Sequence, residues 1–379
     1  MAALRFVSAG AAHPVVGAVA RDAGVAVEGS FGAVGAMLEK FRAGEPCDVL
    51  ILTHAQVAAL TGSADVLPGT AADLGMVPTS IAVRAGDPAP DVGDADALRK
   101  ALLAADAIYF PDPARATAGI HFAKVLDLLG IRGEVDARVK TFPNGATAMA
   151  AMAKAEGRPI GCTQATEILA TAGAKLVAPL PAGYDLETVY TASVAARGER
   201  QAAAAFVARL TGIGAAAARA AAGFRGYAIR PAVAEDVAAI RALVRSVLDE
   251  HGLAPDPSGI DRDLDDPLAA YAGSGGMLDA VVAGDGRVVG SCGVIPLPHG
   301  GCELRKMYLA PGARGHGLGK RLLDRAVAFA RGRGFERIEL ETASVLGRAM
   351  ALYTAAGFQP LARKPAARRC DRAFELALR

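Results

Sequence analysis

Cysteine is rare in this sequence, and its spacing does not suit cross-links or metal sites. The 379 residues include five cysteines, at positions 47, 162, 292, 302 and 370, and no C-x-x-C motif. An odd number at such wide spacing argues against a disulfide scaffold and against a zinc knuckle. The six histidines form no H-x-x-x-H pair, and we predict no metal site.

Long apolar runs and an excess of one charge are also missing. No run approaches the ~20 apolar residues that a bilayer requires, so we expect no membrane partner. Residues 1–8 lack the basic region and long apolar core of a secretory signal, which favours a cytoplasmic protein. Lys and Arg total 41 against 39 Asp and Glu, a net charge of +2, which argues against nucleic-acid binding.

The first 224 residues alternate short apolar runs with Ala-rich stretches. This alternation predicts parallel βαβ units and an α/β domain. The expected strands are 4–7, 25–28, 48–52, 81–84, 107–109, 140–142, 159–162 and 188–194. The expected helices are 12–22, 33–42, 56–60, 121–129, 146–154, 167–171, 201–210 and 213–223.

A different pattern begins near residue 225, where we place a domain boundary. A long helix with one apolar face and a run of hairpin-linked strands indicate a mixed α+β domain over 225–379. Its expected helices are 235–249, 261–271, 317–331 and 346–356. Its expected strands are 227–231, 278–283, 287–295, 302–309, 337–342, 359–361 and 373–378.

A glycine-rich turn separates a strand from a helix in this second domain. Residues 312–320 read Gly-Ala-Arg-Gly-His-Gly-Leu-Gly-Lys and follow Met307-Tyr308-Leu309. Such a turn points backbone N–H groups outward, and the helix N-terminus adds positive potential, so the pattern predicts a pyrophosphate site. It matches neither a P-loop nor a dinucleotide fingerprint.

A second motif strengthens this interpretation. Residues 349–358 contain A-x-x-L-Y-x-x-x-G-F, and with the turn they make residues 226–379 resemble the GNAT superfamily of acyl-CoA-dependent N-acetyltransferases. The resemblance implies a splayed sheet that binds acetyl-CoA along Met307, Tyr308 and Leu309. It also implies pyrophosphate contacts from Arg314, Gly315, His316, Gly317, Leu318, Gly319 and Lys320.

Direct acyl transfer needs a neutral amine, an oxyanion stabiliser and an acid for the departing thiolate. Tyr353 matches the family's common general acid, although a Tyr packed on the core is the alternative. Glu303 is a candidate base or water-ordering carboxylate, or else a strand Glu in a salt bridge with Arg305. Where many relatives have Asn seven residues before the Tyr, this chain has Leu346.

The expected acceptor loop, residues 251–276, is rich in aspartate. Asp261, Asp263, Asp265 and Asp266 all lie within six residues. Either they form a solvated acidic face or they attract a cationic amine.

In the first domain, several strands end in a small polar residue just before a helix. Each such residue can cap its helix. In open α/β sheets, ligands bind at the carboxyl ends of the strands, so together they favour a cleft for a small anion. The candidate ligand-binding residues are Ser8, Ala9, Gly10, Ser30, Phe31, Thr117, Ala118, Asn144, Gly145 and Thr163. Arg115 could pair with a carboxylate of the ligand.

Residues 1–224 resemble the type 2 periplasmic binding proteins, particularly the molybdate-binding branch. The segments that carry the likeness include Val7-Ser8-Ala9-Gly10-Ala11, Gly29-Ser30-Phe31-Gly32 and Asp112-Pro-Ala-Arg-Ala-Thr-Ala-Gly-Ile120. The resemblance implies two lobes, residues 1–80 plus 192–224 and residues 81–191, with the ligand between them. Relatives include an isomerase of small tricarboxylates, so either an oxyanion or a carboxylate is an expected ligand.

Our main interpretation is an acetyl-CoA-dependent N-acetyltransferase acting on an amine. Its first domain binds a small anionic metabolite, either to regulate the enzyme or to capture a substrate. One alternative is a bifunctional protein whose first domain isomerises a carboxylic acid, with His13, His54 and His121 as the only histidines available there. Another is a solute-binding protein with a degenerate GNAT domain.

Overall fold

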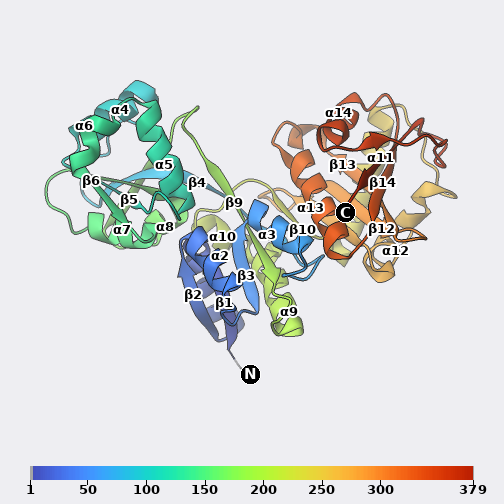
Figure 1. Ribbon diagram of the computed structural model, residues 1–379, viewed down its shortest axis with the longest axis horizontal. Helices are drawn as coiled ribbons and strands as arrows, with labels where there is room; N and C mark the ends of the chain where they lie inside the picture. The colour runs from blue at the N-terminus through green and yellow to red at the C-terminus, as the bar shows by residue number, and fades with distance from the viewer. Residues whose placement is uncertain (1–2, 379) are drawn as a thin grey trace. The chain divides into compact units, whose positions relative to one another are not determined.

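The computed structural model describes residues 3–378, which form two compact units (Figure 1). The first unit consists of Met1–His54 and Asp73–Gly226. The second consists of Tyr227–Arg379 together with Ala55–Ala72, a segment taken from within the first half of the chain. The polypeptide therefore passes between the units three times.

One lobe of the first unit is built on a four-stranded part of its sheet. Strand β1 (Leu4–Ala9) pairs in parallel with β2 (Val27–Gly32) and β3 (Val49–Thr53), and β3 pairs antiparallel with β9 (Glu187–Val194). The helices of this lobe are α1 (His13–Ala23), α2 (Val34–Arg42), α9 (Arg200–Thr211) and α10 (Ala216–Ala221). Because β1 and β3 carry mostly buried apolar residues, they read as core strands of a parallel sheet.

The other lobe continues the same sheet through β4 (Ala72–Arg84), a strand of 13 residues that lies beside β9. The strands of this lobe are β5 (Ala107–Pro111), β6 (Val139–Phe142), β7 (Pro159–Gln164) and β8 (Ala174–Pro179). The helices are α4 (Ala95–Ala104), α5 (Thr117–Leu128), α6 (Arg132–Val135), α7 (Gly145–Met152) and α8 (Ala165–Leu169). Strands β4 and β9 therefore connect the lobes.

The second unit is a seven-stranded sheet in the order β10-β11-β12-β13-β14-β16-β15. These strands are β10 (Ala228–Pro231), β11 (Met277–Val282), β12 (Val288–Pro296), β13 (Gly301–Leu309), β14 (Arg337–Thr342), β15 (Gln359–Pro360) and β16 (Arg372–Ala377). Only β13 and β14 pair in parallel among these described strands. The mixed sheet agrees with the predicted α+β class.

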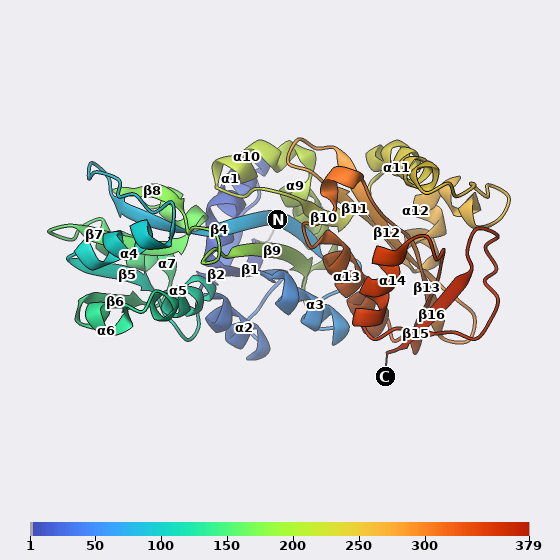
Figure 2. The same cartoon turned by 90° about the horizontal axis from the view of Figure 1, so that it is seen from above.

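Helices cover both faces of this second sheet (Figure 2). On one face, α11 (Val237–Glu250) buries Ile240, Val244 and Leu248 against β11, beside the short helix α12 (Pro267–Ala270). On the other face, α13 (Leu318–Gly332) and α14 (Gly347–Ala355) pack on the main core. The predicted helix over 261–271 is instead a 3-10 turn, Ile260–Leu264, followed by α12.

The segment 55–72 packs closely against α13. It contains most of α3 (His54–Gly62), and a Cβ placed on Gly332 would lie 2.0 Å from the Thr61 carbonyl oxygen, so only glycine fits there. The buried Arg325 side chain donates from Nε to Asp279 at 2.8 Å and from Nη2 to the Ala71 carbonyl at 2.6 Å. These contacts make the segment an integral part of the second unit.

Candidate functional site

The two parallel strands of the second unit separate part-way along their length. Pairing of β13 with β14 runs from Gly301 opposite Arg337 to Leu304 opposite Leu340 and then ends. Beyond it, β13 pairs with β12, and the register of that pairing shifts between Ser291 and Gly293. A gap therefore opens between β13 and β14 at the level of residues 305–309.

Lys306 marks the bulge that produces this separation. Its φ is +50°, a left-handed conformation that non-glycine residues seldom adopt. The Ser291 hydroxyl donates to the Lys306 carbonyl at 2.7 Å and so satisfies a group that the irregular ladder leaves unpaired. The bulge is thus fixed by a specific side chain on the neighbouring strand.

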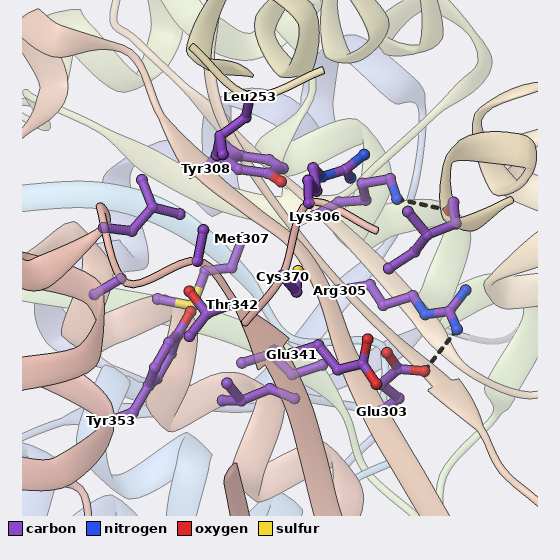
Figure 3. Close-up of a pocket in the computed structure, with 17 residues that line it drawn as sticks. Leu253, Glu303, Arg305, Lys306, Met307, Tyr308, Glu341, Thr342, Tyr353 and Cys370 are labelled. Atoms are coloured by element: carbon purple, nitrogen blue, oxygen red, sulfur yellow. Dashed lines mark hydrogen bonds and ion pairs between the residues drawn. The ribbon is translucent and has the colours of Figure 1, made fainter. Parts of the chain in front are cut away.

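A small cavity of about 60 Å³ lies in the gap (Figure 3). The residues that line it include Glu303, Met307, Tyr308, Leu346, Tyr353 and Cys370. Figure 3 shows the Tyr353 side chain extending from α14 toward Thr342, on the β14 side of the gap. The structure thus brings both predicted catalytic residues to one cavity. Leu346 also lines it, at the position where an Asn was the family expectation.

The Tyr353 phenol is held in an apolar setting. The residue is 6% exposed, and its ring lies 5.9 Å from that of Phe358 and 6.4 Å from that of Phe374, centroid to centroid. Burial is the main reason that the pKa of Tyr353 is raised well above its ordinary value. The phenol therefore stays protonated near neutral pH and can serve as a proton donor.

Glu303 is buried and paired with a cation. Its carboxylate accepts a hydrogen bond from Arg305 Nη2 at 2.6 Å, and the Glu303 side chain is 7% exposed. This is the salt bridge that the sequence offered as the alternative to a catalytic role. Arg305 thus fixes the orientation of the Glu303 carboxylate, and Glu303 lines the cavity.

The glycine-rich turn leads into α13 as expected. Gly315 and Gly317 have φ values of +84° and +71°, and Gly317 directly precedes the first helical residue, Leu318. A left-handed conformation favours glycine at both positions. The backbone N–H groups of the first turn of this 15-residue helix are the donors that an anion can use.

The charged side chains of the turn are already engaged. Arg314 makes two hydrogen bonds to Glu250, at 2.6 and 2.7 Å, and a third to the Leu309 carbonyl at 3.0 Å. Lys320 is exposed and pairs with Asp324 at 2.7 Å. His316 Nδ1 lies 3.1 Å from the Arg314 carbonyl, and its ring packs edge-on against Tyr227. Arg314 therefore anchors the turn to α11, and the main chain is left as the principal anion donor.

The four aspartates of the acidic loop divide into two kinds, because Asp265 and Asp266 are exposed as a solvated face requires, whereas the other two are not. Asp261 and Asp263 are not solvated, because their side chains are 5% and 7% exposed and each lies 3.0 Å from Lys306 Nζ. Lys306 Nζ also donates to the Ile260 carbonyl (Figure 3), and Arg369 makes two hydrogen bonds to Asp261. Although burial opposes it, this pairing lowers the pKa of Asp261 to about 2. The two carboxylates hold the loop on the bulge and are not exposed to attract an amine.

In the first unit, two predicted ligand-binding hydroxyls make contacts within their own lobe. Ser8 is fully buried, and its hydroxyl donates to the Ala9 carbonyl at 3.0 Å. The Ser30 hydroxyl donates to Glu45 and accepts from Lys40 Nζ at 2.7 Å. Neither residue caps a helix. Phe31, next to Ser30, packs its ring 4.5 Å from that of His13.

The predicted residues of the other lobe differ in role. Asn144 caps α7 by accepting from the Thr147 N–H at 2.9 Å, as the sequence suggested. Thr117 begins α5, and Ala118 follows it, but the cap position is Ala116, so Thr117 does not cap its helix. Thr163 does not cap α8 either, because its hydroxyl donates to Glu167 at 2.6 Å.

The two lobes touch across the predicted cleft. The Gly35 N–H donates to the Arg115 carbonyl at 3.0 Å, and Arg115 pairs weakly with Glu39 at 3.7 Å across exposed side chains. Lobe one approaches Glu167 so closely that a Cβ on Gly10 would lie 3.0 Å from Glu167 Oε1. Glu167 was not among the predicted residues. Its sequence signal was a single acidic residue in the middle of the otherwise uncharged segment Ala165–Leu169.

Comparison with known families identifies both units. Residues 4–225, more than half of the chain, match the family of bacterial extracellular solute-binding proteins, and residues 244–358 match the acetyltransferase (GNAT) family. The chain belongs to the solute-binding protein family and carries a GNAT acetyltransferase domain. The predicted fusion and fold classes are confirmed. We call the first unit the solute-binding domain and the second the GNAT domain.

Two curated relatives are similar to parts of this chain. An uncharacterized N-acetyltransferase of Escherichia coli, YjgM, is 40% identical over 130 residues, which are 33% of this chain and 77% of that protein. The aconitate isomerase of a Pseudomonas species is 26% identical over 161 residues, 42% of this chain and 60% of that enzyme. The GNAT domain is thus an N-acetyltransferase domain, as predicted.

Solved structures of both kinds are similar at low identity. The periplasmic molybdate-binding protein of Azotobacter vinelandii has a TM-score of 0.48 and 23% identity, over 58% of this chain and 98% of that chain. A GNAT acetyltransferase of Staphylococcus aureus Mu50 has a TM-score of 0.39 and 22% identity, over 40% of this chain and 99% of that one.

Between residues 3 and 378, no single helix has the length and apolar composition to cross a bilayer. Helix α9 meets that test only when joined to residues Ile213–Ala221, from which it is bent by 57°.

Proposed function

We propose that the protein transfers the acetyl group of acetyl-CoA to an amine and that its solute-binding domain binds a small anionic metabolite. The observation that carries the first part is the gap between β13 and β14, with the protonated Tyr353 phenol beside it. A splayed strand pair next to a glycine-rich helix N-terminus suits an extended donor with a pyrophosphate. The GNAT family match supports this assignment.

The main chain is the proposed binding surface for the donor. Residues 307–309 have a strand partner on the β12 side, while the β14 side of this segment faces the gap, where Met307 and Tyr308 line the cavity. The N–H groups at the start of α13, preceded by Gly315 and Gly317, would bind the pyrophosphate. Arg314 contributes by fixing the turn, because its guanidinium is paired with Glu250.

The proposed chemistry requires little more than orientation and one proton donor. Acetyl-CoA supplies the thioester carbonyl, and the neutral amine attacks this carbonyl to form the C–N bond. The C–S bond then breaks and releases the thiolate of CoA. Tyr353 would protonate that thiolate as it leaves. Glu303, oriented by Arg305, would accept a proton from the ammonium formed on the acceptor, directly or through water.

The proposed role of the solute-binding domain is to bind a small anion that regulates the enzyme or is captured as substrate. Its family match and the helix N-termini at the carboxyl ends of its strands support this role. Carboxylate isomerisation by this domain is a weaker candidate, because His121 Nε2 is already bonded to the Tyr184 carbonyl at 2.7 Å. Of the three histidines, His13 is the exposed one and is therefore the remaining candidate base; its ring contacts that of Phe31 at a tilt.

Two measurements on the full-length protein test the proposal. Incubation with acetyl-CoA and a panel of amines should release free thiol in proportion to acetylated product. A thermal-shift screen against carboxylates and oxyanions should find at least one ligand that does not compete with acetyl-CoA. If no amine in a broad panel is acetylated although acetyl-CoA binds, the degenerate-domain alternative is favoured.

A further inference from the structure

The strongest unexplained group in the molecule is the carboxylate of Glu167. It lies in the solute-binding domain, and the residue is buried, with 8% of its surface exposed. Its Oε2 accepts a hydrogen bond from the Thr163 hydroxyl at 2.6 Å. The main-chain N–H groups of Gly145, Ala146 and Gln164 also favour the ionised form of this carboxylate. The protein thus supplies polar groups to a buried carboxylate in place of water.

These donors have the composition of an anion site. Gly145 and Ala146 are the first residues of α7, an eight-residue helix whose free N–H groups point along its axis. The contact also depends on glycine, because a Cβ on Gly145 would lie 1.9 Å from Glu167 Oε2 and 2.0 Å from Thr163 Oγ1. A side chain at residue 145 would thus displace the carboxylate.

The position of this site matters as much as its chemistry. Gly145 and Thr163 belong to one lobe, and the Glu167 carboxylate extends toward Gly10 of the other lobe, where a Cβ would lie 3.0 Å from Oε1. Gly10, Gly145 and Thr163 are all among the residues predicted to bind the ligand. The chain's own carboxylate therefore lies where an anion was expected.

We propose that Glu167 is a built-in anionic ligand of the solute-binding domain and determines its specificity by excluding small oxyanions such as sulfate and molybdate from this site. The proposal rests on the proposed anion-binding function of the domain. A second anion cannot use the same N–H and hydroxyl donors while the carboxylate holds them, and like charges at this distance repel one another. The metabolite must then bind through other groups of the cleft.

The pKa of the Glu167 carboxyl is raised above its ordinary value, because burial outweighs the opposing effects of the Thr163 hydroxyl and of three backbone N–H groups. The hydroxyl and these N–H groups favour the ionised form, as they would favour a bound anion.

The test removes the Glu167 carboxylate and adds small anions from solution. In full-length Glu167→Ala, sodium formate, acetate or sulfate should occupy the vacated donors and raise the Tm by about 2 °C or more at saturating concentration. The parent protein should respond by less than about 0.5 °C, within the range expected for no specific binding. Leu126→Ala is the matched control, because it destabilises the core of the same lobe without changing an anion site, and it should show no anion response.

Glu167→Ser replaces the alanine variant if that variant does not fold, and it carries the same expectation. Micromolar binding of sulfate or molybdate by the parent protein overturns the proposal. So does a folded Glu167 variant that is no more sensitive to these anions than Leu126→Ala, since Glu167 would then serve the fold alone. A parent protein that binds no carboxylate at all contradicts the proposed function of the domain but leaves the anion response of the variant as a separate result.

Discussion

The two candidate sites of this protein differ in how their polar groups are satisfied. In the GNAT domain, β13 leaves β14 after Leu304, and the backbone beyond faces a cavity. In the solute-binding domain, the hydroxyls of Ser8, Ser30 and Thr163 all have partners within the protein. One site leaves its main-chain groups facing a gap, whereas the other satisfies its polar side chains internally.

This contrast shows which kind of sequence motif indicates a functional site reliably. Main-chain N–H groups at a strand end or a helix N-terminus cannot rotate toward another acceptor, because the fold fixes their direction. A side-chain hydroxyl can rotate to the nearest acceptor, and here it does. Interpretations based on the glycine-rich turn therefore transfer from sequence to structure more directly than those based on isolated Ser and Thr residues.

The largest expected effect is on the open site, through Gly317→Asp. The φ of +71° disfavours any side chain at this position, and a carboxylate would repel the pyrophosphate at the start of α13. Loss of two or more charge-assisted hydrogen bonds, each worth ~1.5–3 kcal/mol, should weaken acetyl-CoA binding by more than ~100-fold. Calorimetry on the full-length protein measures this change in the affinity for acetyl-CoA.

Gly317→Ala is the control that separates charge from backbone strain. It carries the same φ penalty without the carboxylate and should retain most of the affinity that Gly317→Asp loses. Equal affinity of parent and Gly317→Asp, both folded, would remove the helix N-terminus from the donor site.

The next effect concerns stability and the bulge. Lys306→Met removes the ammonium group that lies 3.0 Å from both Asp261 and Asp263, whose side chains are buried. Breaking a buried ion pair from one side typically costs ~3–5 kcal/mol, and we expect the free energy of unfolding of the GNAT domain to fall by that order. Urea denaturation followed by circular dichroism measures the change. Arg287→Met, which breaks an exposed pair with Asp285, should leave the transition in place.

Tyr353→Phe tests the chemistry at the same gap. Removal of a general acid lowers turnover by ~10²-fold or more, and the KM for acetyl-CoA should remain nearly unchanged because the ring and its packing are kept. Steady-state kinetics under conditions where chemistry limits the rate provide the comparison. Turnover within twofold of the parent would assign protonation of the thiolate to another group.

Much of the fold could be predicted from the sequence because periodicity and glycine positions are local signals. The alternation of strands and helices, the turn before α13 and the Tyr353 motif were all found in this way. The first half of β4 was missed, since Ala72–Ser80 contains Asp73, Gly75 and Pro78, residues that usually interrupt strands. Its buried Asp73 is accommodated by a hydrogen bond from Thr191, 118 residues away.

The parts of the sites that escaped prediction depend on contacts between distant segments. Arg369 reaches Asp261 over 108 residues, and Lys306 reaches the same loop over 46 residues. Asp261 and Asp263 therefore look solvated in the sequence and are buried in the structure, whereas Asp265 and Asp266 are exposed. The significance of Glu167 likewise arises from Gly145 and Gly10, which no local pattern connects to it.

The stability of both domains should fall at low pH, in each case through one aspartate whose pKa is lowered by its hydrogen bonds. Hydrogen bonds from Arg5 lower the pKa of Asp48 to about 2, and the pKa of Asp261 is also lowered to about 2. Both values lie below the ~3.9 of an unfolded Asp, so the stability that each ionised group contributes is present above about pH 4 and is lost as the pH falls toward 2. Acid unfolding curves of Asp48→Asn and Asp261→Asn should each take up fewer protons on unfolding than the parent between pH 4 and 2.

The smallest expected effect is that of Ser30→Ala, a change in the predicted ligand cleft. The Ser30 hydroxyl is held by Glu45 and Lys40, so its loss should remove a partly exposed hydrogen bond worth ~0.5–1.5 kcal/mol and leave the affinity for the metabolite unchanged. Thr117→Ala, at the first residue of α5, is the companion variant. A tenfold or greater loss of affinity in Ser30→Ala alone would mean that the hydroxyl leaves Glu45 when ligand arrives. The difference between the two sites would then hold only in the absence of ligand, because the hydroxyls of the cleft would turn to the ligand when it binds.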